Sequence, residues 1–145
     1  MTEFLTESTF VTAVMAWFVA QVLKVILVLV TENKFDMERF IGSGGMPSSH
    51  SAFVTSLATE VGLTAGFTSE LFAVAAVLAM VVMYDATGVR RAAGEQAKLL
   101  NNIIEKWGKK EFPNVELKEL LGHTPVQVFA GAMLGILVAV LRHLM

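Results

Sequence analysis

The sequence contains no cysteine, only three prolines and few charged residues, which make up 17% of its 145 positions. Without cysteine neither a disulfide scaffold nor a thiolate metal site can form, and the redox compartment stays open. The net charge of −2 gives no general attraction to nucleic acid. What the chain has instead is apolar: 54% of its residues are hydrophobic, and the mean hydropathy is +0.62. This composition excludes disordered and disulfide-rich classes and favours a membrane protein.

Four apolar runs are long enough, or nearly so, to cross a bilayer. The strongest, 10–30, covers a ~30 Å hydrocarbon core at ~1.5 Å rise per residue. The runs 71–86 and 126–141 are slightly short, and 47–66 is the weakest because serines and threonines mark one face. We therefore expect an all-α fold, a polytopic membrane helical bundle with about four transmembrane spans, as a single integral membrane domain over 1–145. The alternative is a soluble four-helix bundle, but its helices would each need a charged face, which 10–30 lacks.

The cations of the sequence fall almost entirely on one side of this arrangement. The segments 31–46 and 88–124 share one side of the membrane, and the two termini share the other. Because cytoplasmic loops are enriched in Lys and Arg, both segments are predicted to be cytoplasmic and both termini exoplasmic, in a plasma membrane of bacterial type. The exoplasmic side carries Arg142, and the cytoplasmic side carries Lys34, Arg39, Arg90, Arg91, Lys98, Lys106, Lys109, Lys110 and Lys118.

The second cytoplasmic segment contains an amphipathic stretch. Apolar residues recur at helical spacing from Val89 to Trp107, opposite a face of charged residues, and Gly108 is placed to end a helix. This pattern predicts a cytoplasmic interfacial helix that lies on the membrane surface.

Two histidines occupy equivalent places, because His50 and His123 each fall at the start of a predicted span on the cytoplasmic side. A helix start presents unpaired N–H groups and the positive end of the helix dipole. Two such starts that converge form an anion site. Candidate cations and one acid on the same face complete the set: Lys24, Arg39, Asp85, Arg90 and Arg91.

Each of these residues also has a simpler interpretation. A single histidine is more often a structural group than a catalyst. Arg90 and Arg91 are equally explained as positive-inside anchors, with Asp85 as their counter-charge. The pattern Gly131-x-x-x-Gly135 is typical of a helix-packing surface, and on that basis we expect a homo-oligomer.

Two motifs resemble those of the type 2 phosphatidic acid phosphatase superfamily, which includes the vanadium haloperoxidases. The run Pro47-Ser48-Ser49-His50-Ser51 is similar to the second motif of those phosphatases, and Gly122-His123-Thr124-Pro125 looks like the end of their third. The short divergent branch is resembled more closely, since it also has patterns like Gln21-x-x-Lys24 and Tyr84-Asp85-Ala86-x-Gly88-Val89-Arg90-Arg91. The resemblance covers most of the chain.

The resemblance implies roles for these residues. His123 would be the nucleophile that forms a phosphohistidine, and His50 the general acid that protonates the leaving alcohol. Neutral imidazole attacks phosphorus without a metal and imidazolium gives up a proton near neutral pH, so we expect neither a metal ion nor a cofactor. Cations, hydroxyls and backbone N–H groups would hold the phosphate oxygens, with side chains from Lys24, Arg39, Ser48, Ser49, Arg90 and Arg91.

The sequence departs from the superfamily pattern at three places. The first motif is not intact, because Lys34 and Arg39 are too close together and no proline follows. The arginine expected before the nucleophile is replaced by Leu117, and the aspartate expected after it by Gln127. We therefore expect other residues on the same face to take these roles. Asp85 is expected to orient the nucleophile, and Arg90 or Arg91 to supply the missing phosphate contact.

The predicted function is a membrane lipid-phosphate phosphatase that hydrolyses a phosphomonoester or diphosphate head group at the cytoplasmic face. A phosphate site beside a gap between spans suits a head group whose tail remains in lipid. Candidate substrates are phosphatidylglycerol phosphate, phosphatidic acid and isoprenoid diphosphates, and no nucleic acid partner is expected. One alternative is a non-catalytic protein that binds anionic lipids or scaffolds a partner. Another is a small transporter in which Lys24 and Glu60 line a polar path.

Overall fold

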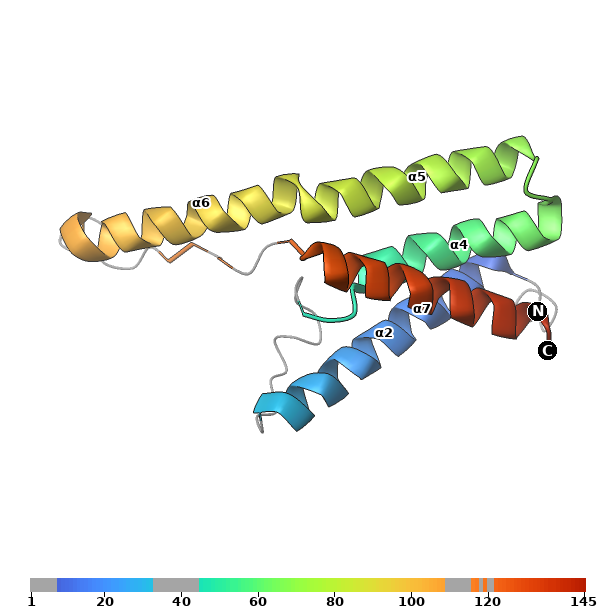
Figure 1. Ribbon diagram of the computed structural model, residues 1–145, viewed down its shortest axis with the longest axis horizontal. Coiled ribbons are helices and arrows are strands. Elements are labelled where there is room, and N and C mark those ends of the chain that lie inside the picture. The colour runs from blue at the N-terminus through green and yellow to red at the C-terminus, as the bar shows by residue number, and fades with distance from the viewer. Residues whose placement is uncertain (1–7, 33–44, 109–115, 118, 120–121) are drawn as a thin grey trace.

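The computed structural model describes residues 8–32, 45–108, 116–117, 119 and 122–145. Within these ranges the chain is helical and contains no strand. The helices are α2 (Thr9–Glu32), α4 (Ser49–Ala65), α5 (Glu70–Thr87), α6 (Val89–Ile103) and α7 (Pro125–His143), and the π-helical turn η1 (Ile104–Gly108) follows α6 directly (Figure 1). The predicted all-α class is confirmed for the described residues.

Polar caps set the starts of α4 and α7. Ser48 Oγ accepts a hydrogen bond from Ser51 N at 3.3 Å. Thr124 Oγ1 accepts from Gln127 N at 3.4 Å, and Gln127 Oε1 accepts from Thr124 N at 3.0 Å, which makes a capping box with Pro125 in the first turn. These bonds satisfy N–H groups that a helix start near lipid cannot leave unpaired.

Three of the described helical segments are long and apolar enough to span a bilayer: Thr9–Val30, Glu70–Trp107 and Pro125–His143. The remaining predicted span, 47–66, corresponds to α4. Its 17 residues rise only about 26 Å, short of a ~30 Å hydrocarbon core. Length and composition therefore support three of the four expected spans.

The central helix of the bundle is α4. It contacts α2, α5 and α7, and in Figure 1 it runs between α5 and the other two. Ser51 and Thr55, which form a polar stripe on this helix, are both buried. Thr55 Oγ1 donates to the carbonyl oxygen of Ser51 at 2.7 Å and to that of Ala132 on α7 at 3.1 Å. The hydroxyl groups thus find partners inside the protein, as a membrane bundle requires.

Two glycines allow α7 to lie directly against α4. A Cβ atom on Gly131 would collide with the carbonyl oxygen of Ser48, and one on Gly135 would collide with the carbonyl oxygen of Ala52 and with Thr55 Oγ1. The G-x-x-x-G surface is therefore covered by another helix of the same chain. It no longer supports the homo-oligomer that we expected from it.

The helix α6 continues α5 along nearly the same line (Figure 1). The two helices are separated by Gly88, whose φ and ψ angles of −102° and −89° are not helical. Gly88 N donates to Tyr84 O at the end of α5, and Ala92 N donates to Gly88 O at the start of α6, each at 2.9 Å. The 38-residue segment Glu70–Trp107 rises about 57 Å at ~1.5 Å per residue, so α6 extends well beyond a ~30 Å core. The predicted amphipathic helix is present, but the chain continues straight at Gly88 instead of turning to lay it on the membrane surface.

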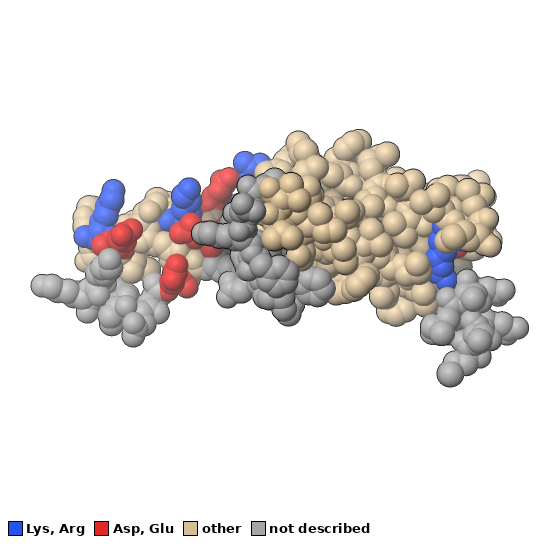
Figure 2. Space-filling model, turned by 90° about the horizontal axis from the view of Figure 1, so that it is seen from below, with Lys and Arg blue, Asp and Glu red and all other residues tan. Residues whose placement is uncertain are grey.

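The surface of the bundle suits lipid. Figure 2 shows a broad uncharged area, with charged side chains gathered over α6 and η1 at one end and a smaller group at the other. Apolar side chains of α5 point outward, among them Leu71, Val74 and Val77, which are 68%, 69% and 59% exposed. An apolar area of this kind is stable when covered by lipid tails and would favour aggregation in water.

A second polar cluster lies at the end of the bundle opposite α6. Arg142 at the end of α7 donates to a backbone oxygen at the start of α2. His143 Nδ1 lies 3.4 Å from Glu60 Oε1 on α4. Lys24, by contrast, packs against Gly45 beside the start of α4. Lys24 and Glu60 are therefore not neighbours, and these two side chains do not line one path.

We expect Gly135→Val to destabilise the bundle. Valine is no worse a helix former than glycine, so the loss would report the collision of its side chain with the backbone of α4. Overpacking of this kind costs about 1–3 kcal/mol. Thermal unfolding in detergent should show a lower midpoint for Gly135→Val, whereas the control Met133→Ala changes a side chain that is 51% exposed and should leave it nearly unchanged. Equal midpoints for Gly135→Val and the wild type would contradict the packing.

Candidate functional site

Two helix starts and one helix end meet at the α6 end of the bundle. Ser48 N donates to Gln127 O at 3.1 Å, which ties the start of α4 to the first turn of α7. His123 N donates to Ala86 O at 2.9 Å, which ties the residue before the α7 cap to the last turn of α5. His50, in the first turn of α4, and His123 are thereby brought to the same end of the molecule.

Gly122 allows His123 to approach the junction of α5 and α6. Its φ angle of +83° lies in the left-handed region that favours glycine. A Cβ atom at this position would lie 2.5 Å from Arg91 N and 2.7 Å from Arg91 Cα. Both atoms belong to the backbone of α6, so no side-chain movement relieves the contact. The residue at 122 therefore sets the position of His123 relative to Arg90 and Arg91.

The imidazole of His123 is buried, with 4% of the residue exposed, and its two ring nitrogens have different surroundings. Nδ1 lies 3.3 Å from Gln127 Oε1, which also accepts from Thr124 N at 3.0 Å. Because a backbone N–H donates to it, this atom of Gln127 is the amide oxygen, and an amide oxygen only accepts. Nδ1 of neutral His123 therefore carries the proton and Nε2 the lone pair. Among the described residues Nε2 has no hydrogen-bond partner, although it is buried.

A small cavity lies between the two histidines. Its lining comes from α4, α5, α6 and the segment before α7, and consists of His50, Val82, Ala86, Arg90, Gly122 and His123. The volume is about 10 Å³, close to the space that one water molecule needs. Arg90 lines this cavity while its Nε pairs with Asp85 Oδ2 at 2.5 Å. A phosphate group is larger than a water molecule, so side chains here have to move before one can enter.

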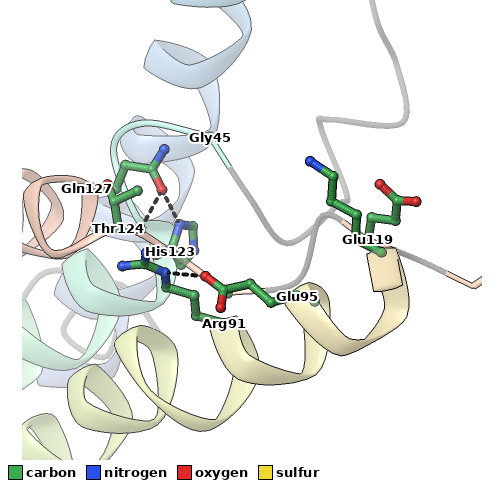
Figure 3. Close-up of a pocket in the computed structure, with 10 residues that line it drawn as sticks. Gly45, Arg91, Glu95, Glu119, His123, Thr124 and Gln127 are labelled. Atoms are coloured by element: carbon green, nitrogen blue, oxygen red, sulfur yellow. Dashed lines mark hydrogen bonds and ion pairs between the residues drawn. The ribbon is translucent and has the colours of Figure 1, made fainter. Parts of the chain in front are cut away.

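A larger pocket of about 270 Å³, here called the α6 pocket, opens on the other side of His123. Figure 3 shows His123 beside Gln127 and Thr124, with Arg91 and Glu95 facing them from α6. Arg91 Nε pairs with Glu95 Oε1 at 3.2 Å. The pocket is lined by Gly45, Arg91, Gly94, Glu95, Lys98, Glu119, Gly122, His123, Thr124 and Gln127.

The remaining predicted phosphate contacts differ in their placement. Lys24 is 1% exposed, and its Nζ donates to Gln21 Oε1 at 2.7 Å. Ser48 and Ser49 are buried at the start of α4, where the hydroxyl oxygen of Ser48 serves as the helix cap. Arg39 lies outside the described residues.

The electrostatic surroundings keep His123 neutral. Burial is the main cause that lowers its pKa from the ordinary value of 6.5, and the positive charges of Lys24, His50 and Arg90 act in the same direction. The hydrogen bond to Gln127 raises the pKa and so opposes part of this effect. Because the pKa is lowered, the neutral imidazole persists to more acidic pH than in an isolated histidine. These electrostatic effects mean that Lys24, His50 and Arg90 lie close enough to His123 to interact with it.

The side chain beside the imidazole of His123 is not Asp85, which we expected to orient it. The residue that contacts the imidazole of His123 is Gln127, whereas Asp85 forms its ion pair with Arg90. The reason is geometric: Gln127 is one helical turn beyond His123 and its oxygen is held by the α7 cap, so it reaches Nδ1 directly. At position 127, where the resemblance led us to expect an aspartate, the glutamine therefore provides an uncharged acceptor.

Sequence reasoning missed most of the α6 pocket. The spacing of Arg91, Glu95 and Lys98 puts them on one face of a helix, and this was the available signal. Glu119 gave no signal, because its contribution depends on how the segment before α7 lies against α6.

Three apolar segments long enough to span a bilayer define an integral membrane protein, and a buried histidine lies in a polar site at one end of its helical bundle. The chain belongs to the Divergent PAP2 family, whose sequence model matches residues 5–138. It is also 44% identical, over 147 aligned positions and 93% of each chain, to YuiD of Bacillus subtilis (strain 168), which is described as an uncharacterized membrane protein. No solved structure matches it. The predicted relation to a divergent branch of the phosphatase superfamily is confirmed.

Imidazole NMR of the protein in detergent micelles tests this description of His123. We expect the Nδ1–H tautomer and a titration midpoint below 6.5. Gln127→Glu should raise the pKa of His123 by about one unit or more, since a carboxylate stabilises the imidazolium. Thr124→Ala is the matched control, because it removes the other half of the capping box without touching the ring. A midpoint that does not respond to Gln127→Glu would show that residue 127 is not the partner of Nδ1.

Proposed function

We propose that this chain hydrolyses the phosphate ester of a membrane lipid and that His123 is the nucleophile. The observation that carries the proposal is the state of the buried imidazole: Nδ1 is occupied by Gln127, and Nε2 has no partner among the described residues. A buried polar atom without a partner is unfavourable, and a functional role is one of the few reasons for it to persist. Membership of the Divergent PAP2 family supports the same reaction class.

The proposed reaction has two steps that use both histidines. In the first, Nε2 of His123 attacks phosphorus and the bond between phosphorus and the alcohol oxygen breaks. His50 in its protonated form gives its proton to that oxygen, and the phosphoryl group remains on Nε2. Burial and the positive charges of Arg90 and Lys24 lower the pKa of His50, so the negative charge of the bound phosphate is needed to favour this form. In the second, water attacks the phosphohistidine while neutral His50 takes its proton. Orthophosphate leaves, and both histidines return to their starting protonation states.

Positive groups around His123 would stabilise the charge on the phosphoryl oxygens. Arg90 lines the small cavity beside His123, and the charge of Lys24 acts on the same imidazole. The starts of α4 and α7 contribute their N–H groups and dipoles. Asp85 then acts on Arg90, which it holds by an ion pair, rather than on His123. The other proposed phosphate contacts are Arg39, Ser48, Ser49 and Arg91.

The position of the site suits a lipid substrate. It lies at the end of the bundle where the uncharged surface gives way to the charged surface of α6 (Figure 2). A phosphate head group can therefore reach His123 while its hydrocarbon tail stays among the lipids. The cations of the loops next to this end favour the cytoplasmic face, and hence lipid phosphates of the inner leaflet.

Phosphate release by the purified protein tests the proposed reaction. The panel contains phosphatidic acid, phosphatidylglycerol phosphate and isoprenyl diphosphates in mixed micelles, each with and without EDTA. We expect His123→Ala to abolish release, and His50→Ala to lower kcat by about 10²–10⁴-fold, the usual contribution of a general acid. Release should also persist in EDTA, because the proposed steps use no metal ion.

The alternatives give different results in the same experiment. A folded wild-type protein that binds these lipids but releases no phosphate would be the non-catalytic lipid-binding protein. Release that is unchanged in His123→Ala would exclude the phosphohistidine mechanism. Acid-labile phosphate that is trapped on the wild type and absent from His123→Ala would support it directly.

A reporter fused after Met145 tests the predicted orientation. Because Arg142 is the cation nearest this end and the loop cations lie on the opposite side, we expect the C-terminus to be exoplasmic. Alkaline phosphatase fused there should be active in bacterial cells, and green fluorescent protein should not fluoresce. The reverse pattern would move the site to the exoplasmic leaflet.

A further inference from the structure

Among the described residues, no large apolar side chain lines the α6 pocket: of its ten lining residues three are glycines, four are charged, and the others are His123, Thr124 and Gln127. The small cavity differs, because Val82 and Ala86 form part of its wall. An acyl chain or an isoprenoid that entered the α6 pocket would separate its four charged groups from water. The pocket is therefore suited to a hydrophilic group.

The charges of the pocket are balanced. Arg91 and Lys98 are matched by Glu95 and Glu119. A second phosphate placed here would meet two carboxylates as well as two cations, so the pocket has no net preference for an anion. Donors and acceptors that alternate around one space are instead suited to hydroxyl groups, which donate and accept at once.

The acidic wall of the pocket is held in position. Asn101 Nδ2 donates to Leu117 O at 2.8 Å and to Glu119 Oε1 at 2.9 Å, and Leu117 N donates to Asn101 Oδ1 at 2.9 Å. These three bonds attach the segment that carries Glu119 to α6. A carboxylate fixed in this way can accept a hydrogen bond from a ligand with little loss of side-chain entropy.

The size of the pocket limits its contents. Its volume of about 270 Å³ lies just below the ~300–1,000 Å³ of sites that enclose whole drug-sized molecules. It has room for a group of a few carbon atoms with their hydroxyls. A diacylglycerol would have to remain outside.

We propose that the α6 pocket binds the alcohol portion of the substrate, and that this alcohol is a small polyol carried by a membrane lipid. The inference rests on the proposed phosphatase function and makes it more specific. The preferred substrate is a lipid that bears a phosphomonoester on a polyol head group. Lipids whose phosphate is joined directly to diacylglycerol, and isoprenyl diphosphates, do not fill the pocket and are poorer substrates.

The test compares two lipids with the same acyl chains, phosphatidylglycerol phosphate and phosphatidic acid, as substrates of the full-length protein in mixed micelles. We expect kcat/KM to be at least about tenfold higher for the first, the effect of one or two hydrogen bonds to charged groups. Lys98→Ala and Glu119→Gln should reduce this preference ratio through KM for phosphatidylglycerol phosphate. Lys106→Ala, an exposed residue of η1 outside the pocket, is the matched control and should leave the ratio unchanged.

Each outcome bears on the inference separately from the proposed function. An equal or higher kcat/KM for phosphatidic acid or for an isoprenyl diphosphate would overturn the polyol pocket and leave the phosphatase intact. If Lys98→Ala and Glu119→Gln lower kcat/KM equally for both lipids, the pocket residues are only structural, and the polyol pocket is overturned as well. Absence of hydrolysis of every lipid by the folded wild type would overturn both proposals.

Discussion

The contact between α7 and α4 is the constraint on which the rest of the structure depends. Gly131 and Gly135 let the two helices touch through their backbones, and the bond from Ser48 N to Gln127 O joins their starts. In a membrane, where apolar surface alone gives no reason for helices to associate, close backbone contact and buried hydrogen bonds hold them together. Because the starts are joined, His50 in the first turn of α4 and His123 just before the cap of α7 lie at one end of the bundle. The position of the site therefore depends on the packing of these two helices.

The first turn of α7 also supplies the group that contacts the imidazole of His123. Gln127 lies in the first turn of α7, and its side chain closes the helix cap while it accepts from His123 Nδ1. One amide oxygen therefore performs a structural and an orienting role. It selects the tautomer as a carboxylate would, but it adds no negative charge, so burial and nearby cations keep the imidazole neutral. The proposed attack on phosphorus requires the neutral form of the imidazole.

Much of the local structure could be predicted from the sequence, and less of the site. The apolar runs predicted the helices to within a few residues, since continuous apolar stretches and caps such as Ser48 and Thr124 act locally. The interfacial placement of α6 is not confirmed, because α6 continues nearly along the line of α5 beyond Gly88, and a glycine between two helices permits either a turn or a straight continuation. In the structure Asp85 pairs with Arg90 and does not contact His123. Spacing put Asp85 on the correct face but could not choose between His123 and Arg90.

The sequence by itself determined that this is a helical membrane protein with two histidines at helix starts, and it carried the motifs of the Divergent PAP2 family. These properties depend on hydropathy, periodicity and neighbouring residues. The tertiary structure alone decided that Gln127 orients His123, that Asp85 holds Arg90, and that Glu119 faces α6 across a polar pocket. Such contacts join segments whose relative position is set by helix packing. The distance between two packed helices cannot be read from a local pattern in the sequence of one chain.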